Sequence, residues 1–358
     1  MAGFSQDADI VSEFVERDGA CAAVPSALMG AALDRMRDVA RTGSRDAFLL
    51  AAMRVLALAG NGHTRIIPMP ALEVIPSRIV ARGAGWHLCG ADGGTLEHVD
   101  GIDPETLFAR WTPFLAGTPA RQRAVAGVMF AWPAALSAGG IDPGRQVTFG
   151  LSGGGSVACD MSTRVPALDL YPVHERGGDV PGADPWAKSD SPGTRVRLAS
   201  LAEAEVPDLD AVIADASRRV AAGDGQVVLD LRGNPGGSFL KALPLVAALD
   251  AHAARCAVQV DRYTFSAAIV VAVLVRHRLG ARARLFGETM GDGLTFWAEG
   301  GTATLPQTGA LLRWSDGFHD WAHGDPEGRG PADLRPHMVA TGTPHIHPER
   351  DLEGWLTA

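Results

Sequence analysis

Two short stretches decide how this chain is interpreted: QVVLDLRGNPGG at residues 226–237 and YTFSAA at residues 263–268. The first has the pattern of an apolar strand that runs into a glycine-rich turn. Glycines let a backbone turn sharply and expose its N–H groups. The second stretch delivers Ser266 to the start of a helix that the apolar pattern predicts over residues 266–279. The two stretches therefore predict a strand, a glycine turn and a serine at the start of a helix.

A serine hydroxyl beside exposed N–H groups is the minimum arrangement for acyl transfer, because it supplies a nucleophile and an oxyanion hole. We expect the Ala267 N–H to be one oxyanion donor and the N–H of Gly236 or Gly237 to be the other. Two simpler interpretations stay open. Ser266 could serve only as a helix N-cap, since serine is a preferred cap residue, and the glycine turn could be a plain connector. A phosphate cradle is disfavoured, because no Lys-Ser/Thr follows the turn and the G-x-G-x-x-G spacing is absent.

The segments around these stretches alternate between helix and strand patterns. The expected helices cover residues 208–222, 238–251 and 266–279, and the expected strands cover residues 194–198, 226–231, 257–260 and 283–286. Alternation of this kind predicts an α/β layer with largely parallel strands.

The N-terminal half of the chain has a different character. Apolar residues recur there at spacings of three and four, so residues 8–60 are expected to be helical until Gly60-Asn61-Gly62 ends the last helix. Short strand patterns follow, and residues 174–194 have the composition of a linker or loop. We expect three segments, which are a helical region over 1–70, a mixed α/β region over 71–175 and a catalytic domain over 176–358.

Composition limits the partners and the location of the chain. The 358 residues carry a formal net charge of −9, so neither nucleic acid nor a membrane is expected as a partner. The acidic start MAGFSQDAD lacks the apolar core of a signal peptide, and the most apolar stretch, 267–275, is too short to cross a bilayer. A cytoplasmic location is the resulting expectation. The four cysteines form no C-x-x-C pair and are expected to be isolated thiols: Cys21, Cys89, Cys159 and Cys256.

The inventory of basic residues narrows the choice of a general base. Lysine occurs only at positions 188 and 241, so a dyad of Ser266 with a downstream lysine is excluded. Histidine or a carboxylate remains. His63 stands in GNGHTR, directly after the helical region. His319 and His323 have i, i+4 spacing but lack the glutamate of H-E-x-x-H, so we expect a solvent or pocket-rim role for them and no metal or cofactor.

Three motifs together resemble the tail-specific (C-terminal-processing) and tricorn-type serine peptidases. They are DLRGNPGG at 230–237, TFSAA at 264–268 and LFGETMG at 285–291, and the resemblance extends over roughly 194–340. It implies a crotonase-like (ClpP/crotonase-type) α/β catalytic domain in which Ser266 is the nucleophile. It also implies that the third motif, with Glu288, lines the site.

The same resemblance extends to the base. GNGHT at 60–64 is similar to the GDGHT signature of the family's histidine branch, which implies that His63 is the general base. Glu327, in EGRGPAD, occupies the place of a glutamate that supports the base in tricorn-type members. Asn61 replaces the usual Asp, and Gly62 replaces the tricorn-type serine, so a relay from Glu327 through a side chain at 62 cannot operate. Any coupling must be direct or through water.

The expected substrate is a peptide or a small amide or ester. Trp297, Trp314 and Phe318 are candidate pocket walls, although aromatics in strands also serve as plain core. The segment 96–103 resembles a turn near the peptide-binding modules of such proteases, so the middle region is expected to be a degenerate module of that kind. Two alternatives remain on the same fold. One is a non-catalytic ligand-binding protein like the interphotoreceptor retinoid-binding proteins, and the other is a crotonase-type acyl-thioester enzyme. A homo-oligomer is left open.

Overall fold

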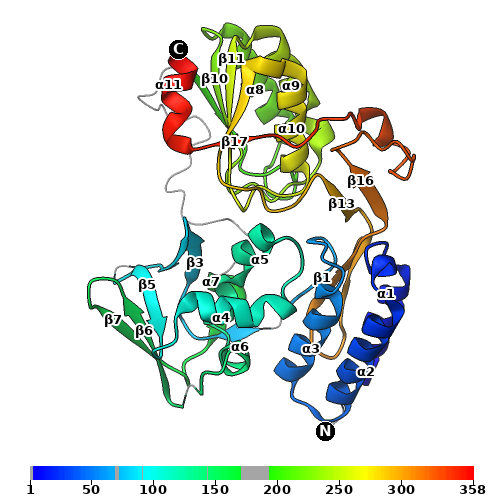
Figure 1. The fold of residues 1–358 in the computed structure, drawn as a ribbon, viewed down its shortest axis with the longest axis vertical. Coiled ribbons are helices and arrows are strands. Elements are labelled where there is room, and N and C mark those ends of the chain that lie inside the picture. The colour runs from blue at the N-terminus through cyan, green and yellow to red at the C-terminus, as the bar shows by residue number, and fades with distance from the viewer. Residues whose placement is uncertain (1–2, 69–71, 91, 143, 171–192) are drawn as a thin grey trace. The chain divides into compact units, whose positions relative to one another are not determined.

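The computed structural model describes residues 3–68, 72–90, 92–142, 144–170 and 193–358. The linker expected at 174–194 lies almost wholly outside these residues. The chain forms two compact units, drawn in Figure 1. Unit 1 comprises Met1–Glu175 and Trp297–Gly317, and unit 2 comprises Arg176–Phe296 and Phe318–Ala358. Residues 297–317, which the sequence patterns place in the catalytic segment, therefore group with the N-terminal half of the chain.

Unit 1 begins with three helices, as the apolar spacing predicts. They are α1 (Ser5–Arg17), α2 (Ser26–Thr42) and α3 (Arg45–Ala57). The later helices are short: α4 (Pro104–Trp111), α5 (Pro119–Val125), α6 (Pro133–Ala138) and α7 (Ala167–Leu170). Proline occupies the first turn of α4, α5 and α6, where its missing N–H costs nothing.

The strands of unit 1 form three antiparallel sheets. The largest has the order β3-β4-β5-β6-β7, and the others have the orders β1-β15-β14 and β2-β8. Their bounds are β1 (Arg65–Ile67), β2 (Glu73–Val74), β3 (Ile79–Arg82), β4 (Gly85–Leu88), β5 (Gly94–Val99), β6 (Gln146–Leu151), β7 (Ser156–Asp160), β8 (Val165–Pro166), β14 (Gly301–Thr304) and β15 (Leu311–Trp314). The pairing of β1 with β15 explains why residues 297–317 belong to this unit, and no local sequence signal indicates it.

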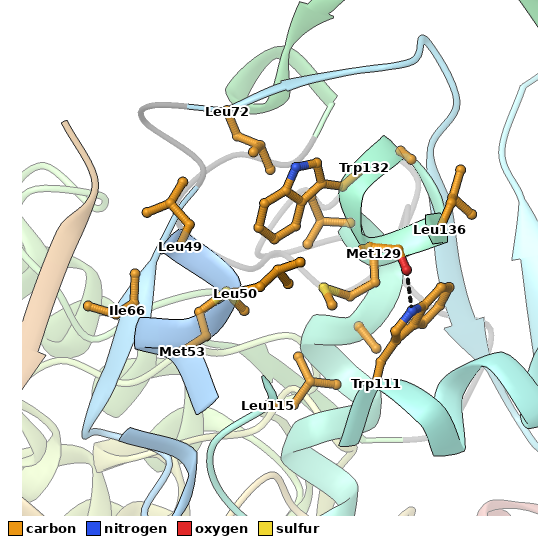
Figure 2. Close-up of a cluster of buried hydrophobic side chains, with 14 of the residues drawn as sticks. Leu49, Leu50, Met53, Ile66, Leu72, Trp111, Leu115, Met129, Trp132 and Leu136 are labelled. Carbon is orange, nitrogen blue, oxygen red and sulfur yellow. Dashed lines mark hydrogen bonds between the residues drawn. The ribbon is translucent and has the colours of Figure 1, made fainter. Parts of the chain in front are cut away.

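A continuous apolar cluster holds the helices and short elements of unit 1 together, and Figure 2 shows its centre. Leu50 and Met53 of α3 face Trp132 and Met129 across it (Figure 2). Two of its three buried indoles have polar partners, since Trp111 Nε1 donates to the Ala135 carbonyl at 2.7 Å and Trp132 Nε1 donates to Asp46 at 3.0 Å, whereas Trp86 Nε1 has no acceptor among the described residues. The cluster is therefore apolar without leaving the Trp111 and Trp132 N–H groups unsatisfied.

Unit 2 is built on one parallel five-stranded sheet of order β17-β12-β11-β10-β9. Its elements are β9 (Thr194–Arg197), α8 (Leu209–Ala222), β10 (Gln226–Asp230), α9 (Leu243–His252), β11 (Arg255–Val260), α10 (Ala267–Leu279), β12 (Ala283–Gly287), β17 (Ile346–His347) and α11 (Leu352–Thr357). The alternation of helices and parallel strands confirms the α/β prediction. Strands β13 (Thr295–Ala298) and β16 (Gly317–Asp320) pair with each other, and the division between the units falls within this ribbon.

Helices cover the sheet of unit 2, with α11 packed against β10 and β11 (Figure 1). Leu352 and Leu356 of α11 meet Val228, Ala257 and Phe286, which come from three neighbouring strands. Helix α10 is apolar on all sides and is buried from Ala267 to Val275, as expected for a helix inside a domain. Within the described residues, no helix has both the length and the apolar character that a membrane span needs.

The prediction of isolated, buried thiols is confirmed for three of the four cysteines, and Cys89 is partly exposed. All four are free thiols, and Cys21, Cys159 and Cys256 are buried. Burial raises the pKa of Cys256 to about 12, so this thiol stays protonated and unreactive at neutral pH.

A buried carboxylate attaches the β14–β15 hairpin to α1. Asp7 is fully buried and accepts hydrogen bonds from Gln307 N (2.9 Å), Thr308 N (2.8 Å) and Thr308 Oγ1 (2.8 Å). Asp7→Ala should lower the free energy of unfolding by about 2–4 kcal/mol, because it leaves buried donors unsatisfied. Urea unfolding measures this, and Asp9→Ala, at an exposed position of the same helix, should change it by less than about 0.5 kcal/mol. Equal effects of the two variants would contradict this role of Asp7.

Candidate functional site

The glycine turn of the first motif is anchored at its start by a buried ion cluster. Asp230, the last residue of β10, is bonded on both oxygens by Arg232, with Nε–Oδ1 at 2.9 Å and Nη2–Oδ2 at 2.8 Å. Arg195 and Arg197 from β9 lie at 3.6 and 3.9 Å from the same carboxylate. Burial alone would raise the pKa of Asp230, but the bonds and charge of Arg232 outweigh it and hold that pKa below its ordinary value. The motif's Asp-Leu-Arg portion is thus structural.

Asn234 joins the turn to its neighbours. Its side chain is fully buried, accepts the Gly236 N–H at 2.8 Å and donates to the Leu198 carbonyl at 2.9 Å. Its backbone carbonyl accepts the Phe265 N–H at 3.0 Å. Asn234 therefore fixes the segment directly before Ser266 as well as the glycine turn.

A second carboxylate, Asp261, ties together the loops that follow β10 and β11. It accepts the N–H groups of Gly233 (3.0 Å), Tyr263 (3.0 Å) and Thr264 (2.9 Å). Burial raises the pKa of Asp261, although these N–H bonds act to lower it. Thr264 Oγ1 adds a bond to the Leu231 carbonyl at 3.0 Å. Sequence reasoning missed Asp261, and its only signal was an Asp directly after an apolar strand.

Ser266 has an unusual backbone. Its φ of 55° and ψ of −127° lie outside the regions that non-glycine residues ordinarily adopt. It precedes α10 but makes no side-chain capping bond. Ser266 is partly exposed, whereas Phe265 and Ala267 on either side are buried. The interpretation of Ser266 as an ordinary N-cap therefore does not fit, and strained residues of this kind cluster at active sites.

The glycine turn and Ser266 lie in direct contact. A Cβ on Gly236 would lie 2.7 Å from the Ser266 Cβ and 2.9 Å from the Phe265 carbonyl oxygen, so only glycine fits. A Cβ on Gly237 would lie 2.1 Å from the Leu201 carbonyl carbon. Both glycines also have positive φ, at 105° and 129°.

The two expected glycine donors differ in their hydrogen bonding. The Gly236 N–H is already used by Asn234, at 2.8 Å. Leu201 bonds the Gly236 carbonyl and the Ser238 N–H, so the Gly237 N–H points to the other side of the segment. In the part of the chain that the structure describes, neither the Gly237 N–H nor the Ala267 N–H has an acceptor. Ala267 directly follows Ser266, and Gly237 directly follows Gly236, which contacts Ser266.

His63 belongs to unit 1, and Ser266 belongs to unit 2. His63 is fully buried in the connection between α3 and β1. Hydrogen bonds of the residues before and after His63 hold its loop in place. The Asn61 side chain donates to the Trp297 carbonyl at 3.0 Å and accepts the Trp297 N–H at 3.2 Å. Thr64 Oγ1 donates to buried Asp18 at 2.7 Å. An aspartate at position 61 could not donate to the Trp297 carbonyl, which accounts for the amide found there.

Glu327 lies on an exposed loop of unit 2, with its Oε2 at 3.0 Å from Arg329 Nε. The anchor of this loop is Asp325, which is buried and accepts the N–H groups of Arg329 and Gly330, each at 2.9 Å. Sequence reasoning missed Asp325. The Asp-Pro-Glu-Gly composition at 325–328 is the turn signal that marks it.

The remaining candidate residues are divided between the units. In unit 1, Trp297 packs on Gly19, where a Cβ would lie 2.2 Å from the ring, and Trp314 stacks on Phe14 at 4.3 Å between ring centroids. In unit 2, Phe318 is buried beneath the Arg329 guanidinium, 3.9 Å from its ring centroid. These contacts give each aromatic side chain a packing role.

Glu288 follows β12 and pairs with Arg262 at 2.8 Å. It is partly exposed and lies at the carboxyl edge of the parallel sheet, where the loops that carry Asp261 and Ser266 also begin.

The solvent or pocket-rim role expected for His319 is wrong. The residue is only 4% exposed, and its ring stacks on Phe296 at 4.9 Å. Its place in paired strand β16 accounts for this, since the ring is buried with the strand. His323 is exposed and its Nδ1 lies 3.0 Å from Asp320. Among the described residues, no group of histidine, cysteine and acidic side chains could hold a metal ion.

Comparison with known proteins gives a structural match only. No protein-family model matches the chain, and no curated protein matches it. Among solved structures, mature CPAF superposes with a TM-score of 0.57 at 12% identity, over 99% of this chain and 95% of that one. Mature CPAF complexed with lactacystin gives the same TM-score and identity, over 99% and 97% of the two chains. The chain thus shares the fold of mature CPAF over nearly its whole length, and at 12% identity this likeness concerns the fold alone.

Proposed function

We propose that this chain is a serine peptidase that cleaves peptide or small amide or ester bonds, with Ser266 as nucleophile and His63 as general base. Unit 2 is then its crotonase-like catalytic domain. The observation that carries the proposal is the strained Ser266, whose hydroxyl caps no helix and which contacts the glycine turn; among the described residues, the N–H groups of Gly237 in that turn and of Ala267 after Ser266 have no acceptor. A serine used only for packing or capping has no need of this backbone conformation.

The proposed reaction starts with attack of Ser266 Oγ on the substrate carbonyl carbon while His63 takes the hydroxyl proton. The carbonyl oxygen becomes an oxyanion that accepts hydrogen bonds from the N–H groups of Gly237 and Ala267. Gly237 is preferred to Gly236 because the Gly236 N–H already bonds Asn234. The N-terminal end of α10 adds a positive dipole at the same place.

The intermediate collapses when His63 returns its proton to the leaving group, which departs and leaves an acyl-serine. Water then hydrolyses this ester by the same steps, with His63 as base and the same N–H donors. The buried position of His63 and the bonds of Asn61 and Thr64 support a fixed ring orientation. Glu327 supports the base directly or through water in this proposal, and Glu288 lines the substrate site.

A fluorophosphonate probe tests the nucleophile. The probe should label Ser266, because an activated serine attacks phosphorus as it attacks a carbonyl carbon. Mass spectrometry of the intact protein should show one adduct, which Ser266→Ala abolishes and Ser238→Ala, an exposed serine next to the glycine turn, leaves in place. Labelling that persists in Ser266→Ala would rule the assignment out. A complete lack of labelling in the parent would favour the ligand-binding or acyl-thioester alternatives.

Replacement of the base tests His63. His63→Ala should lower kcat by about a thousandfold or more, as loss of a triad member does, while His252→Ala, at an exposed position, should leave it unchanged. In the parent, kcat/KM should fall at acidic pH, because a protonated base cannot accept the serine proton. Retained activity in His63→Ala would mean that another group is the base.

A pair of loop variants separates catalytic support from anchoring. Glu327→Gln should lower kcat and kcat/KM together with little change in melting temperature, because a supporting carboxylate acts on the imidazolium of the transition state. Asp325→Asn should instead reduce stability, by about 1–3 kcal/mol, because it weakens the bonds to two backbone N–H groups. If Glu327→Gln keeps normal per-molecule activity, Glu327 has no part in catalysis.

A further inference from the structure

A cavity of about 640 Å³ in unit 2 gathers basic side chains from three parts of the chain. Arg276 and His277 come from the last turn of α10, and Arg284 comes from β12. His345 and His347 come from the end segment that forms β17. The volume is in the range of small-molecule sites.

The sheet register places two of these side chains on one face. Phe286 pairs with His347 in the parallel ladder between β12 and β17. Arg284 lies two residues before Phe286, and His345 lies two residues before His347. Alternation along a strand therefore directs Arg284 and His347 to the side of the sheet that Phe286 faces, on which α11 packs, and His345 directly precedes β17. The rings of the two histidines meet edge to face at 4.4 Å between centroids.

The charges of the two arginines in the cavity are not neutralised by nearby carboxylates in the described part of the chain. In the described ranges of the chain, no Asp or Glu lies within ion-pair distance of these five side chains. Burial lowers the pKa of His347, and the charges of His345 and Arg284 lower it further, while Asp351 acts weakly in the opposite direction. The chain as a whole carries a net charge of −9, so this local excess of positive charge is unusual for it.

Helix electrostatics account for only part of the cluster. Cations are favoured at a helix C-terminus, and Arg276 donates to the Gly280 carbonyl at 2.7 Å there. This explains Arg276 and His277. The guanidinium of Arg284, on β12, lies 5.3 Å from the Trp355 ring centroid, and His347, on β17, lies 5.6 Å from Phe286, so aromatic contacts also help to place these two. Three histidines could suggest a metal site, but within the described residues no such group has the geometry to hold a metal ion.

We propose that this basic cavity binds a phosphate-bearing small molecule with two or more negative charges. Arginine and histidine side chains from three elements surround the space, and a phosphate group has enough oxygens to accept bonds from several of them, whereas a carboxylate has two. The Thr343 hydroxyl is a further donor on its lining.

This site is separate from the proposed peptidase site. The cavity lies at the C-terminal end of α10, and Ser266 precedes the same helix. A rise of 1.5 Å per residue puts about 15 Å between Ser266 and Arg276. A ligand here would not contact the nucleophile, so the cavity is a candidate regulatory site and its occupancy can be tested independently of activity.

Isothermal titration of the full chain at constant ionic strength tests the proposal, with inorganic phosphate, pyrophosphate and citrate as probes. The parent should bind one pyrophosphate saturably, more tightly than phosphate or citrate. Arg284→Gln/His345→Gln should weaken this binding by at least about tenfold, because charge-assisted hydrogen bonds are lost. Arg278→Gln, an exposed arginine of the same helix turn that does not line the cavity, should bind as the parent does.

Three results would overturn the proposal: no saturable binding of pyrophosphate, equal binding by the parent and the double variant, or citrate binding as tight as pyrophosphate. Melting temperatures of the variants show whether they fold. If the double variant does not fold, exposed His345→Gln alone should still weaken pyrophosphate binding measurably, and unchanged binding in that variant would equally contradict the assignment.

Discussion

The half-buried carboxylate of Asp261 is the constraint on which the candidate active site depends. It gathers N–H groups from the loops after two neighbouring strands, from Gly233 on one side and from Tyr263 and Thr264 on the other. The backbone of Ser266 is strained at a cost of about 1–3 kcal/mol, and such strain persists only where surrounding bonds over-determine it. Asp261 and Asn234 supply those bonds. The glycines of the turn then let it lie closer to Ser266 than residues with a Cβ could.

The same arrangement explains the roles of residues within one motif. Asp230 and Arg232 neutralise each other at the base of the turn, and Asn234 engages the Gly236 N–H. The Gly237 N–H is left without an acceptor in the described chain, beside the equally available Ala267 N–H. Gly237 is exposed, so its N–H is open to solvent and to a substrate that enters from there, and a donor pair of this kind suits a developing oxyanion.

Local patterns in the sequence predict much of this structure. Hydrophobic periodicity and the glycine and proline residues at turns predict the strands at 226–231 and 257–260, the helix at 266–279 and the parallel arrangement of the strands. These features can be predicted because they depend on residues close together in the sequence. The grouping of 297–317 with unit 1 does not follow, since it rests on bonds such as Thr308 to Asp7, which are 301 positions apart. The sequence did not predict the anchoring roles of Asp261 and Asp325 or the burial of His319, for a related reason. A lone polar residue has no period, and its partners appear only once the fold is known.

The most direct measurement of the central claim is a crystal structure of the full chain with a phosphonate covalently bound to Ser266. The account predicts that one phosphonate oxygen accepts the N–H groups of Gly237 and Ala267 at about 2.7–3.1 Å and that the His63 ring lies within hydrogen-bond reach of Ser266 Oγ. A phosphonate oxygen that points away from both N–H groups, or a His63 ring beyond reach of the serine, would contradict it.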